Sequence, residues 1–345
     1  MKIVVASTHV PFIRGGGTKI VEDTRDALRE AGHEVDVVSF PVWEHWQQLP
    51  AQLLAMRLFD LSDSCDRLIA IRTPSHLLRH PSKVLWFLHH HRGAYDLWGT
   101  KFQVIPPNAE GLRVRALIKS ADDVAFGEAQ KIFCTAETIR DRLMRFSGVE
   151  GEVLLPPLTN SGAYHWAPDD GYVFFPSRIA PAKRQELAVA AMAHVRSRTR
   201  LVLAGAPDTV EALEAVERTI ERHGVGDRVT LLAHWISEEE KHNLFSKSLA
   251  CVFVPFDEDS YGYVSLESFY SGKPVVTCTD AGGVLSLVRH GETGFVAAPT
   301  PEALAAAIDQ MASNPDRAHR MGQAGMRLVE ELGITWERVV ERLTQ

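Results

Sequence analysis

Short apolar runs alternate with helical patterns along almost the whole chain, and this alternation is the feature that most restricts its fold. In the first half, β-rich apolar runs lie at 2–7, 34–38, 66–71, 83–88, 132–135 and 152–155. Patterns with apolar residues at helical spacing lie between them, at 20–28, 43–61, 113–126 and 137–146. Strands that alternate with helices form parallel sheets covered by helices. We therefore predict an α/β, doubly wound domain here.

A second series of the same kind follows a break in the pattern. Pro156 and Pro157 open a polar segment, and the strand-like runs resume at 172–177, 200–204, 229–232, 252–255, 275–276 and 294–296. A proline pair followed by polar residues is typical of a linker. We therefore predict two doubly wound domains, with the following boundaries: a first domain at 1–156, a linker at 157–171, a second domain at 172–330, and a C-terminal helix at 331–345 that crosses back to the first domain.

Charge and cysteine content exclude some classes of protein. The formal net charge is -7, whereas nucleic-acid binders are usually basic. The four cysteines, at positions 65, 134, 251 and 278, are scattered and form no C-x-x-C pair, which favours a reducing, cytoplasmic setting. No segment has the length and apolarity needed to cross a bilayer, so membrane contact would be peripheral. Because the net charge is negative, a site for a phosphate would need a local group of cations.

The stretch 252–277 carries the first candidate site. It predicts a strand, an acidic loop, a short helix that begins near Tyr263, and a stop at Gly272. Asp259 lies in the loop and Glu267 in the opening turns of the helix. The carboxyl ends of parallel strands are where ligands bind, and a helix start suits an anion such as phosphate. The carboxylates could accept hydrogen bonds from sugar hydroxyls; alternatively, they form a solvated acidic loop.

Two cations follow the first strand of the second domain. Arg178 and Lys183 belong to the loop after 172–177, on the same predicted sheet edge as Asp259 and Glu267. A guanidinium and an ammonium group together suit a diphosphate when no metal is present. Taken singly, each is equally explained as surface charge.

The first domain has a glycine-rich turn and a run of histidines at strand ends. Gly15, Gly16 and Gly17 follow the first strand, but their spacing is not G-x-G-x-x-G and no acidic residue closes the second strand, so a dinucleotide site is not expected. The histidines at 89–91 end the run 83–88. Alternation places His89 and His91 on one face and His90 on the other, which disfavours a three-histidine metal site and leaves substrate contact or structural packing.

The order of these pieces resembles the retaining, nucleotide-sugar-dependent glycosyltransferases of family four, which have the GT-B architecture. The matching segments are PFIRGGG (11–17), GHEVDVVS (32–39), a strand ending in histidine, VLLPP (153–157), SRIAPAK (177–183), the stretch 252–277 with GKPVV, and GGVLSLVRHGETGFV (282–296). The resemblance implies two Rossmann-like domains that face each other across a cleft. It also implies transfer of a sugar from a nucleoside diphosphate to an acceptor hydroxyl, with retention at the anomeric carbon.

The resemblance assigns roles to individual residues. The family pattern has two glutamates separated by seven residues, and here Asp259 replaces the first. Glu267 is expected to bind the donor ribose, Asp259 the transferred sugar, Arg178 and Lys183 the diphosphate, and His89 the reacting centre, with His91 as its rival. The full set expected to bind the donor is Gly16, Gly17, Arg178, Lys183, Ser260, Tyr261, Gly262, Tyr263, Val264 and Glu267. The residues expected on the acceptor side are His91, Arg92 and Tyr95.

The resemblance further implies a metal-independent enzyme without a cofactor. Its co-substrate would be a UDP- or GDP-sugar, and its acceptor a small molecule or a glycan or lipid-linked molecule. Two alternatives stay open at this point. One is a related GT-B enzyme, either a sugar-nucleotide epimerase or a pseudo-glycosyltransferase that joins non-sugar rings. The other is a catalytically silent subunit that binds a nucleotide sugar or a partner enzyme.

Overall fold

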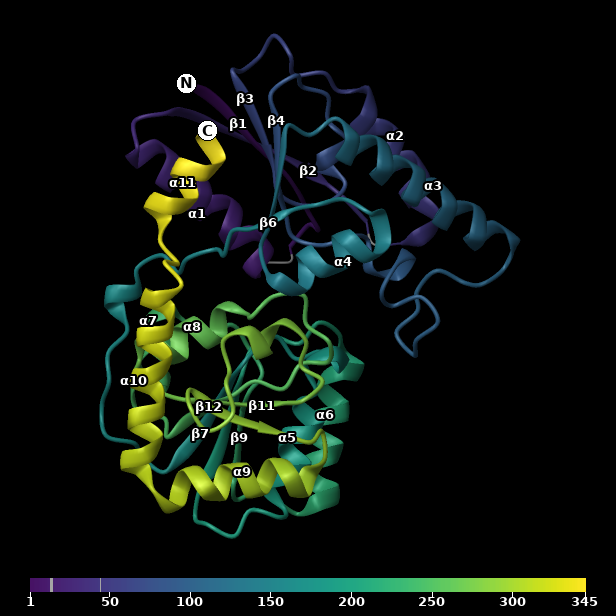
Figure 1. The fold of residues 1–345 in the computed structure, drawn as a ribbon. Coiled ribbons are helices and arrows are strands. Elements are labelled where there is room, and N and C mark those ends of the chain that lie inside the picture. Colours follow the sequence, from purple (N-terminus) through teal and green to yellow (C-terminus); the bar gives the residue numbers. More distant parts are fainter. Residues whose placement is uncertain (13–14, 44) are drawn as a thin grey trace. The chain divides into compact units, whose positions relative to one another are not determined.

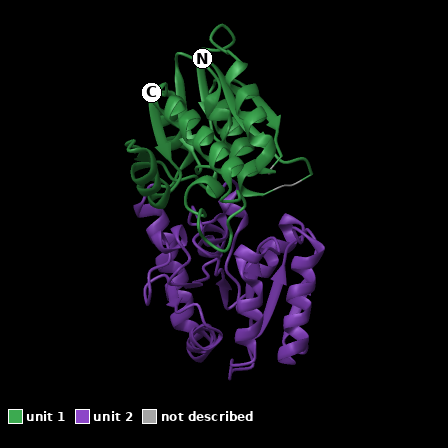
Figure 2. Cartoon of the chain, turned by 90° about the vertical axis from the view of Figure 1, so that its right-hand side faces the viewer, with its two compact units in different colours: residues 1–157, 334–345 green, residues 158–333 purple. Residues whose placement is uncertain are grey.

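The chain divides into two compact units in a computed structural model that describes residues 1–12, 15–43 and 45–345 (Figure 2). The first unit comprises residues 1–157 and 334–345, and the second comprises residues 158–333. Segment 158–171, expected as a linker, is therefore part of the second unit, and the chain returns to the first unit at Ile334 rather than at 331. Residues 13 and 14 of the PFIRGGG motif, and residue 44 of the expected helix 43–61, lie outside the described residues.

A parallel sheet of six strands, in the order β2-β1-β3-β4-β5-β6, forms the centre of the first unit (Figure 1). The strands are β1 (Lys2–His9), β2 (Glu34–Pro41), β3 (Arg67–Ala70), β4 (Lys83–Phe87), β5 (Lys131–Cys134) and β6 (Glu152–Val153). The helices are α1 (Gly16–Glu30), α2 (Leu49–Leu58), α3 (Ala109–Gly127), α4 (Glu137–Ser147) and α11 (Trp336–Thr344). This pattern confirms the predicted α/β class.

Both faces of this sheet are covered. Ile3 and Val5 of β1 belong to one apolar cluster, which also holds residues of α1 and α11, whereas Val4 and Ala6 belong to another with residues of α2 and α3. Successive side chains of a strand point to opposite faces, so β1 supplies both clusters. This is why its sequence is a continuous apolar run rather than an alternating one.

Helix α11 returns to the first unit and packs into its core. Val339 and Leu343 are buried there, and the ring of Trp336 meets that of Trp86 edge-on, at 6.1 Å between centroids. Edge-to-face packing of two large rings adds to the apolar area that the helix buries. The last helix of the chain is thus part of the first unit, although it follows the whole of the second.

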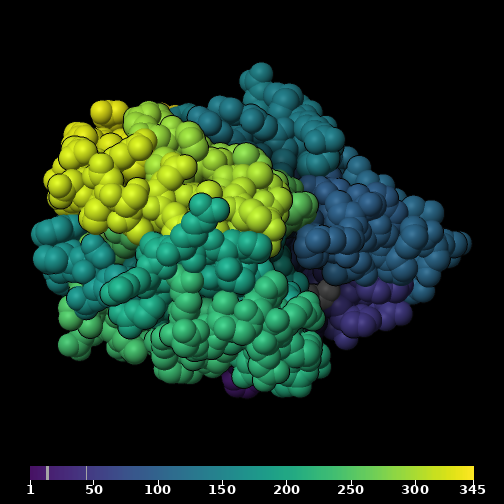
Figure 3. Space-filling view, turned by 90° about the horizontal axis from the view of Figure 1, so that it is seen from below, coloured from purple at the N-terminus to yellow at the C-terminus, as the bar shows by residue number. Residues whose placement is uncertain are grey.

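The second unit has a parallel sheet in the order β12-β11-β10-β7-β8-β9. Its strands are β7 (Tyr172–Pro176), β8 (Arg200–Ala204), β9 (Val229–Leu232), β10 (Ala250–Val252), β11 (Val275–Cys278) and β12 (Gly294–Ala297). Its helices are α5 (Gln185–Met192), α6 (Val210–His223), α7 (Glu238–Ser246), α8 (Tyr263–Tyr270), α9 (Pro301–Ser313) and α10 (Pro315–Glu331). Helix α9 packs against α5, and its yellow surface lies next to teal segments in Figure 3.

Local chemistry explains where some helices differ from expectation. Helix α3 begins before residue 113 because the side chain of Asn108 accepts a hydrogen bond from the Gly111 amide, at 2.9 Å. Helix α2 begins only at Leu49, later than expected. Pro50 has no amide hydrogen, so it is tolerated in the first turn of a helix but not in its interior. Among the described residues, no helix combines the length and apolarity required to cross a membrane.

Candidate donor site on the second sheet

Strands β7 and β10 are parallel neighbours at the centre of the second sheet, and the order in which strands are added to the sheet reverses between them. Strands β8 and β9 continue on one side of β7, while β11 and β12 lie beyond β10. In open parallel sheets this switch point, at the carboxyl ends of the strands, is where ligands bind. The loop after β7 carries Arg178 and Lys183, and the segment after β10 carries Asp259 and leads into α8. The topology therefore brings the four predicted residues to one edge of one sheet.

Backbone hydrogen bonds fix the loop that carries Asp259. The Asp257 amide donates to the carbonyl of Asp280 at 2.8 Å, and the Gly283 amide donates to the carbonyl of Glu258 at 2.7 Å. Gly282 has a φ of 65°, and a Cβ at this position would lie 2.4 Å from the Glu258 carbonyl oxygen. The tight turn after β11 thus requires glycine to approach the acidic loop.

The loop then delivers the chain to the start of α8. Asp259 is 9% exposed and Tyr261 is buried, while Ser260 and Val264 are partly accessible. Gly262 precedes the helix with a φ of 71°, and a Cβ there would lie 2.7 Å from the ring of Phe253. The N-cap residue is this glycine, so it has no side chain to cap the first turn of α8, which begins at Tyr263. Amide groups at such a start are available to an anion.

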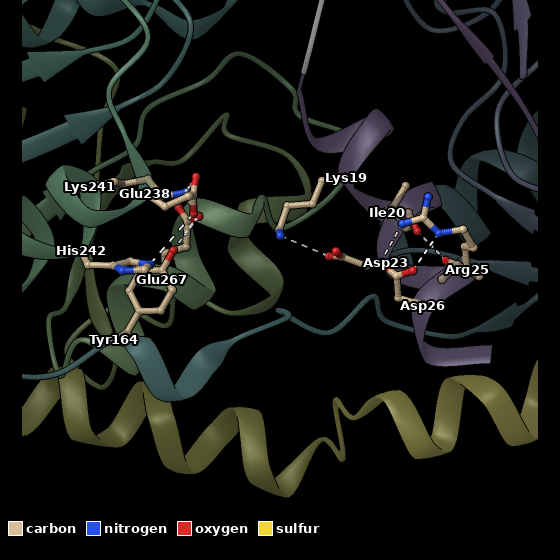
Figure 4. Close-up of polar contacts among 11 residues, drawn as sticks. Lys19, Ile20, Asp23, Arg25, Asp26, Tyr164, Glu238, Lys241, His242 and Glu267 are labelled. Atoms are coloured by element: carbon tan, nitrogen blue, oxygen red, sulfur yellow. Dashed lines mark hydrogen bonds and ion pairs between the residues drawn. The ribbon is translucent and has the colours of Figure 1, made fainter. Parts of the chain in front are cut away.

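Glu267 is buried in α8 and is bound by two donors (Figure 4). The Lys241 ammonium from α7 lies 2.8 Å from its Oε1, and the Tyr164 hydroxyl donates to the same oxygen at 3.0 Å. Lys241 also contacts Glu238, at 2.9 Å. Lys241 and Tyr164 are not predicted from the sequence, although Lys241 directly follows the segment Ser237–Glu240, in which the Ser237 side chain caps the start of α7.

Arg178 and Lys183 each contact a carboxylate. Arg178 Nη1 lies 2.5 Å from Oδ1 of Asp208, in a partly exposed pair. Lys183 pairs with Glu258, and its ammonium lies 5.4 Å from the centroid of the Phe253 ring. Both cations thus lie at the switch point, and anionic groups already occupy part of their hydrogen-bonding capacity.

A third cation at this edge, Arg184, is not predicted from the sequence. It has a left-handed backbone conformation, with a φ of 59°. Its guanidinium binds the carboxylate of Asp280 through two hydrogen bonds and also donates to the carbonyls of Val254 and Pro255, at 2.7 and 2.8 Å. It therefore connects the loops after β7, β10 and β11. The adjacent cations in the sequence AKR were the one available signal.

The predicted glycines of the first unit lie at the beginning of α1. Gly16 is the first residue of the helix, and a Cβ on Gly17 would lie 3.3 Å from the side chain of Arg72. Arg72 in turn donates to the carbonyl of Thr8 at 3.0 Å. Beside this turn is a cavity of about 570 Å³, whose lining includes Thr8, His9, Thr18, Glu22, Arg25 and Ser39.

The three histidines after β4 have different environments. His89 is partly accessible, and its Nδ1 lies 2.6 Å from the His90 carbonyl oxygen, which can only accept. Nδ1 therefore carries a proton and donates it to this carbonyl. His90 is buried, contacts Ser147 at 3.1 Å, and burial lowers its pKa to about 4. His91 is half-buried, and burial lowers its pKa as well.

The residues expected on the acceptor side are engaged within the first unit. Arg92 pairs with Asp96 at 2.7 Å. Tyr95 is 5% exposed and donates its hydroxyl to buried Asp122 at 2.8 Å, which also binds His76. The 3-10 turn at Arg92–Ala94 directs Tyr95 into the core, against the ring of His90. As it lies here, Tyr95 is a core residue and not a surface contact.

Within the described ranges, no group of three His, Cys, Asp or Glu side chains could hold a metal ion. The four cysteines are free thiols, and Cys65 is the least buried of them. The arrangement on the second sheet therefore consists of cations, a helix start and two buried carboxylates. Together these groups can bind a diphosphate and the hydroxyl groups of attached sugars.

Comparison with known proteins relates this chain to glycosyltransferases. A sequence model of the glycosyl transferases group 1 family matches residues 159–327. Human alpha-1,3/1,6-mannosyltransferase ALG2 is 25% identical over 294 residues, which cover 77% of this chain and 68% of the human protein. The D-inositol 3-phosphate glycosyltransferase of Nocardia farcinica is 28% identical over 52% of this chain, and the match spans only 40% of that relative.

Solved structures agree on the fold. A sucrose-phosphate synthase from Thermosynechococcus elongatus matches with a TM-score of 0.79 and 20% identity, covering 99% of this chain and 97% of that one. HepE from Anabaena, solved in complex with UDP and glucose, matches with a TM-score of 0.70 and 17% identity, covering 99% of each chain. The predicted GT-B fold is confirmed by these likenesses, and the chain is a glycosyltransferase whose residues 159–327 match the model of the glycosyl transferases group 1 family.

Proposed function

We propose that this enzyme transfers a sugar from a nucleoside diphosphate sugar to an acceptor hydroxyl, with retention at the anomeric carbon. The observation that carries the proposal is the convergence of Arg178, Lys183, the uncapped start of α8, and two buried carboxylates at one switch point. Cations and helix amides suit the diphosphate, while carboxylates suit hydroxyl groups. The donor is a UDP- or GDP-sugar; HepE, which has this fold, was solved with UDP.

Each residue has a role in this proposal. Glu267 accepts hydrogen bonds from the ribose, and Asp259 contacts the transferred sugar. Arg178, Lys183 and the α8 amides stabilise negative charge as it grows on the leaving diphosphate.

The chemistry needs no nucleophile from the protein. The bond from the anomeric carbon to the diphosphate oxygen breaks, and a bond to the acceptor oxygen forms on the same face of the sugar ring. The acceptor hydroxyl gives its proton to the departing diphosphate oxygen. The role of the protein is then to place donor and acceptor and to stabilise the leaving group, which preorganised cations and amides do well.

The test is a screen of UDP-, GDP-, ADP- and TDP-sugars with EDTA present, by thermal shift and by release of nucleoside diphosphate. We expect saturable binding of a UDP- or GDP-sugar and slow release of diphosphate, which an acceptor accelerates. Arg178→Ala should abolish release without unfolding the protein, whereas the exposed control Arg222→Ala should behave as the wild type. Absence of binding by every donor would contradict the proposal.

A further inference from the structure

The carboxylate proposed to bind the ribose has two partners of its own, both on the same oxygen. Lys241 and Tyr164 meet Oε1 of Glu267, at 2.8 and 3.0 Å (Figure 4). The side chains are largely buried, with 17% exposure for Lys241 and 6% for Glu267. A buried, charge-assisted contact of this kind has a defined geometry and excludes water. The two donors therefore fix the orientation of the carboxylate.

The second oxygen remains available. In the part of the chain that the structure describes, Oε2 of Glu267 has no hydrogen-bond partner. An ionised carboxylate offers about four acceptor positions in total, so Oε2 retains two. Two neighbouring hydroxyl groups, such as those of a ribose, match two acceptor positions on one oxygen.

The charge states of the partners suit this role. Burial alone would lower the pKa of Lys241, but Glu267 and Glu238 raise it overall, so Lys241 is a cation at neutral pH. Burial and Glu267 raise the pKa of Tyr164, so its hydroxyl keeps its proton and donates. The other titratable groups here are His242, whose ring packs on Tyr164, and Cys251, whose thiol pKa is raised by burial and by Glu267.

The two partners come from different parts of the chain. Lys241 lies on α7, and Tyr164 lies in the segment between β6 and β7 that joins the two units. This segment is bound to the second unit by backbone hydrogen bonds, such as that from the Ala167 amide to the carbonyl of Ser246, at 3.1 Å. The segment that the sequence suggests is only a linker thus contributes a hydroxyl to the site.

We propose that Lys241 and Tyr164 are positioning residues of the donor site, which hold Glu267 so that Oε2 receives both hydroxyl groups of the nucleotide ribose. This inference rests on the proposed function and deepens it. Removing Lys241 leaves a buried carboxylate without its cation and free to turn. The variant then loses affinity for the nucleotide and also loses its preference for ribose over 2′-deoxyribose.

The test measures binding of UDP and GDP to the full chain by calorimetry, and then of the 2′-deoxy form of whichever nucleotide binds more tightly. For Lys241→Met we expect about tenfold weaker binding of the ribonucleotide and little change for the deoxynucleotide, as expected for lost hydrogen bonds. Donor KM should rise more than kcat falls. Lys241→Arg should restore part of the preference, and Tyr164→Phe should weaken it less. Lys247→Met, at the exposed residue that directly follows α7, is the control.

A double variant separates positioning from direct contact. If Lys241 acts through Glu267, Lys241→Met should weaken binding no further in a Glu267→Gln background. Equal losses in both backgrounds would overturn the inference, and so would an unchanged ribose preference in Lys241→Met and Tyr164→Phe. With either result, binding of UDP or GDP by the wild type would still support the proposed function. If the wild type binds neither nucleotide, both proposals fail. If the Lys241→Met variant does not fold, the preference of the Tyr164→Phe variant for ribose over 2′-deoxyribose decides the test.

Discussion

The guanidinium of Arg184 binds the carboxylate of Asp280 at two points, 2.7 Å from Nη1 to Oδ2 and 2.8 Å from Nη2 to Oδ1. The same guanidinium donates to the carbonyls of Val254 and Pro255, which precede the acidic loop. One side chain therefore connects three loops at the switch point of the second sheet. The positions of Lys183 and Glu258 depend on these contacts of Arg184. Lys183 precedes Arg184 in the chain, and the Glu258 amide donates to the carbonyl of Ala281, next to Asp280.

Replacing Arg184 with lysine should destabilise the second unit. Lysine keeps the charge, but it cannot form two parallel hydrogen bonds to Asp280 while also reaching two carbonyls. We expect a loss of about 2 to 4 kcal/mol in the free energy of unfolding, measured with urea. Arg140→Lys, which alters an exposed pair with neighbouring Asp141, should change it by less than about 0.5 kcal/mol. Similar losses in the two variants would contradict this account.

Replacing Gly282 with alanine should disturb the acidic loop. The new Cβ would lie 2.4 Å from the Glu258 carbonyl oxygen and 2.6 Å from its amide nitrogen, and the φ of 65° is itself unfavourable for alanine. Because the obstacle is backbone, the loop must move, and we expect a loss of about 2 kcal/mol or more in unfolding free energy. Nucleotide binding should also weaken. Gly127→Ala, where no heavy atom lies within 4 Å, is the control, and an equal effect there would refute the steric explanation.

The sequence predicted the fold and the sheet edge on which Arg178 and Asp259 lie, for a physical reason. Strand ends in a parallel sheet meet at one edge, so Arg178 after one strand and Asp259 after another must lie on the same side. His90 was likewise expected on another side from its two neighbours and is the buried one of the three, although β4 itself ends at Phe87. These inferences need only chain order and the periods of strand and helix.

The contacts that complete the site could not be predicted in this way. Tyr164 and Glu267 are 103 positions apart, and Arg184 and Asp280 are 96 apart, so each pairing depends on how side chains fit after the chain has folded. The burial of Tyr95, which the sequence suggests as an acceptor-side residue, was not predicted either, because a single 3-10 turn decides whether its ring points inward. Local patterns carry no information about such turns or long-range partners.

His90 should make the first unit less stable in acid. Burial lowers its pKa from 6.5 to about 4, so between these values the unfolded chain binds a proton that the folded chain does not. Stability is therefore lost as the pH falls through this window, by up to about 3 kcal/mol. Unfolding with urea at several pH values should show this decline, and His90→Phe should reduce it. The exposed His165→Phe should not alter it, and an unchanged decline in His90→Phe would contradict the prediction.

Only one of the four cysteines should react readily with a thiol reagent in the folded protein. Burial raises the pKa of Cys134 to about 12 and that of Cys278 to about 11, and it raises that of Cys251 well above the ordinary value. The thiolate is the reactive form, so these side chains are both inaccessible and protonated. Burial raises the pKa of Cys65 as well, but this side chain is only half-buried and a reagent can reach it. We expect a disulfide reagent to modify Cys65 first and the others only in denaturant; Cys65→Ser should abolish the early phase.

Asp208 should compete with the diphosphate for Arg178. The two side chains form an ion pair of 2.5 Å in which both are partly exposed, so the pair is weak enough for a ligand to replace it. Asp208→Asn removes the competing charge and leaves Arg178 in place. We expect UDP or GDP to bind about two- to fivefold more tightly at low salt, with a smaller gain at high salt because added ions screen the exposed carboxylate. Glu214→Gln, which breaks the exposed pair with Arg218, should leave the affinity unchanged. Weaker binding in Asp208→Asn would instead mean that Asp208 orients Arg178 toward the diphosphate rather than competing with it.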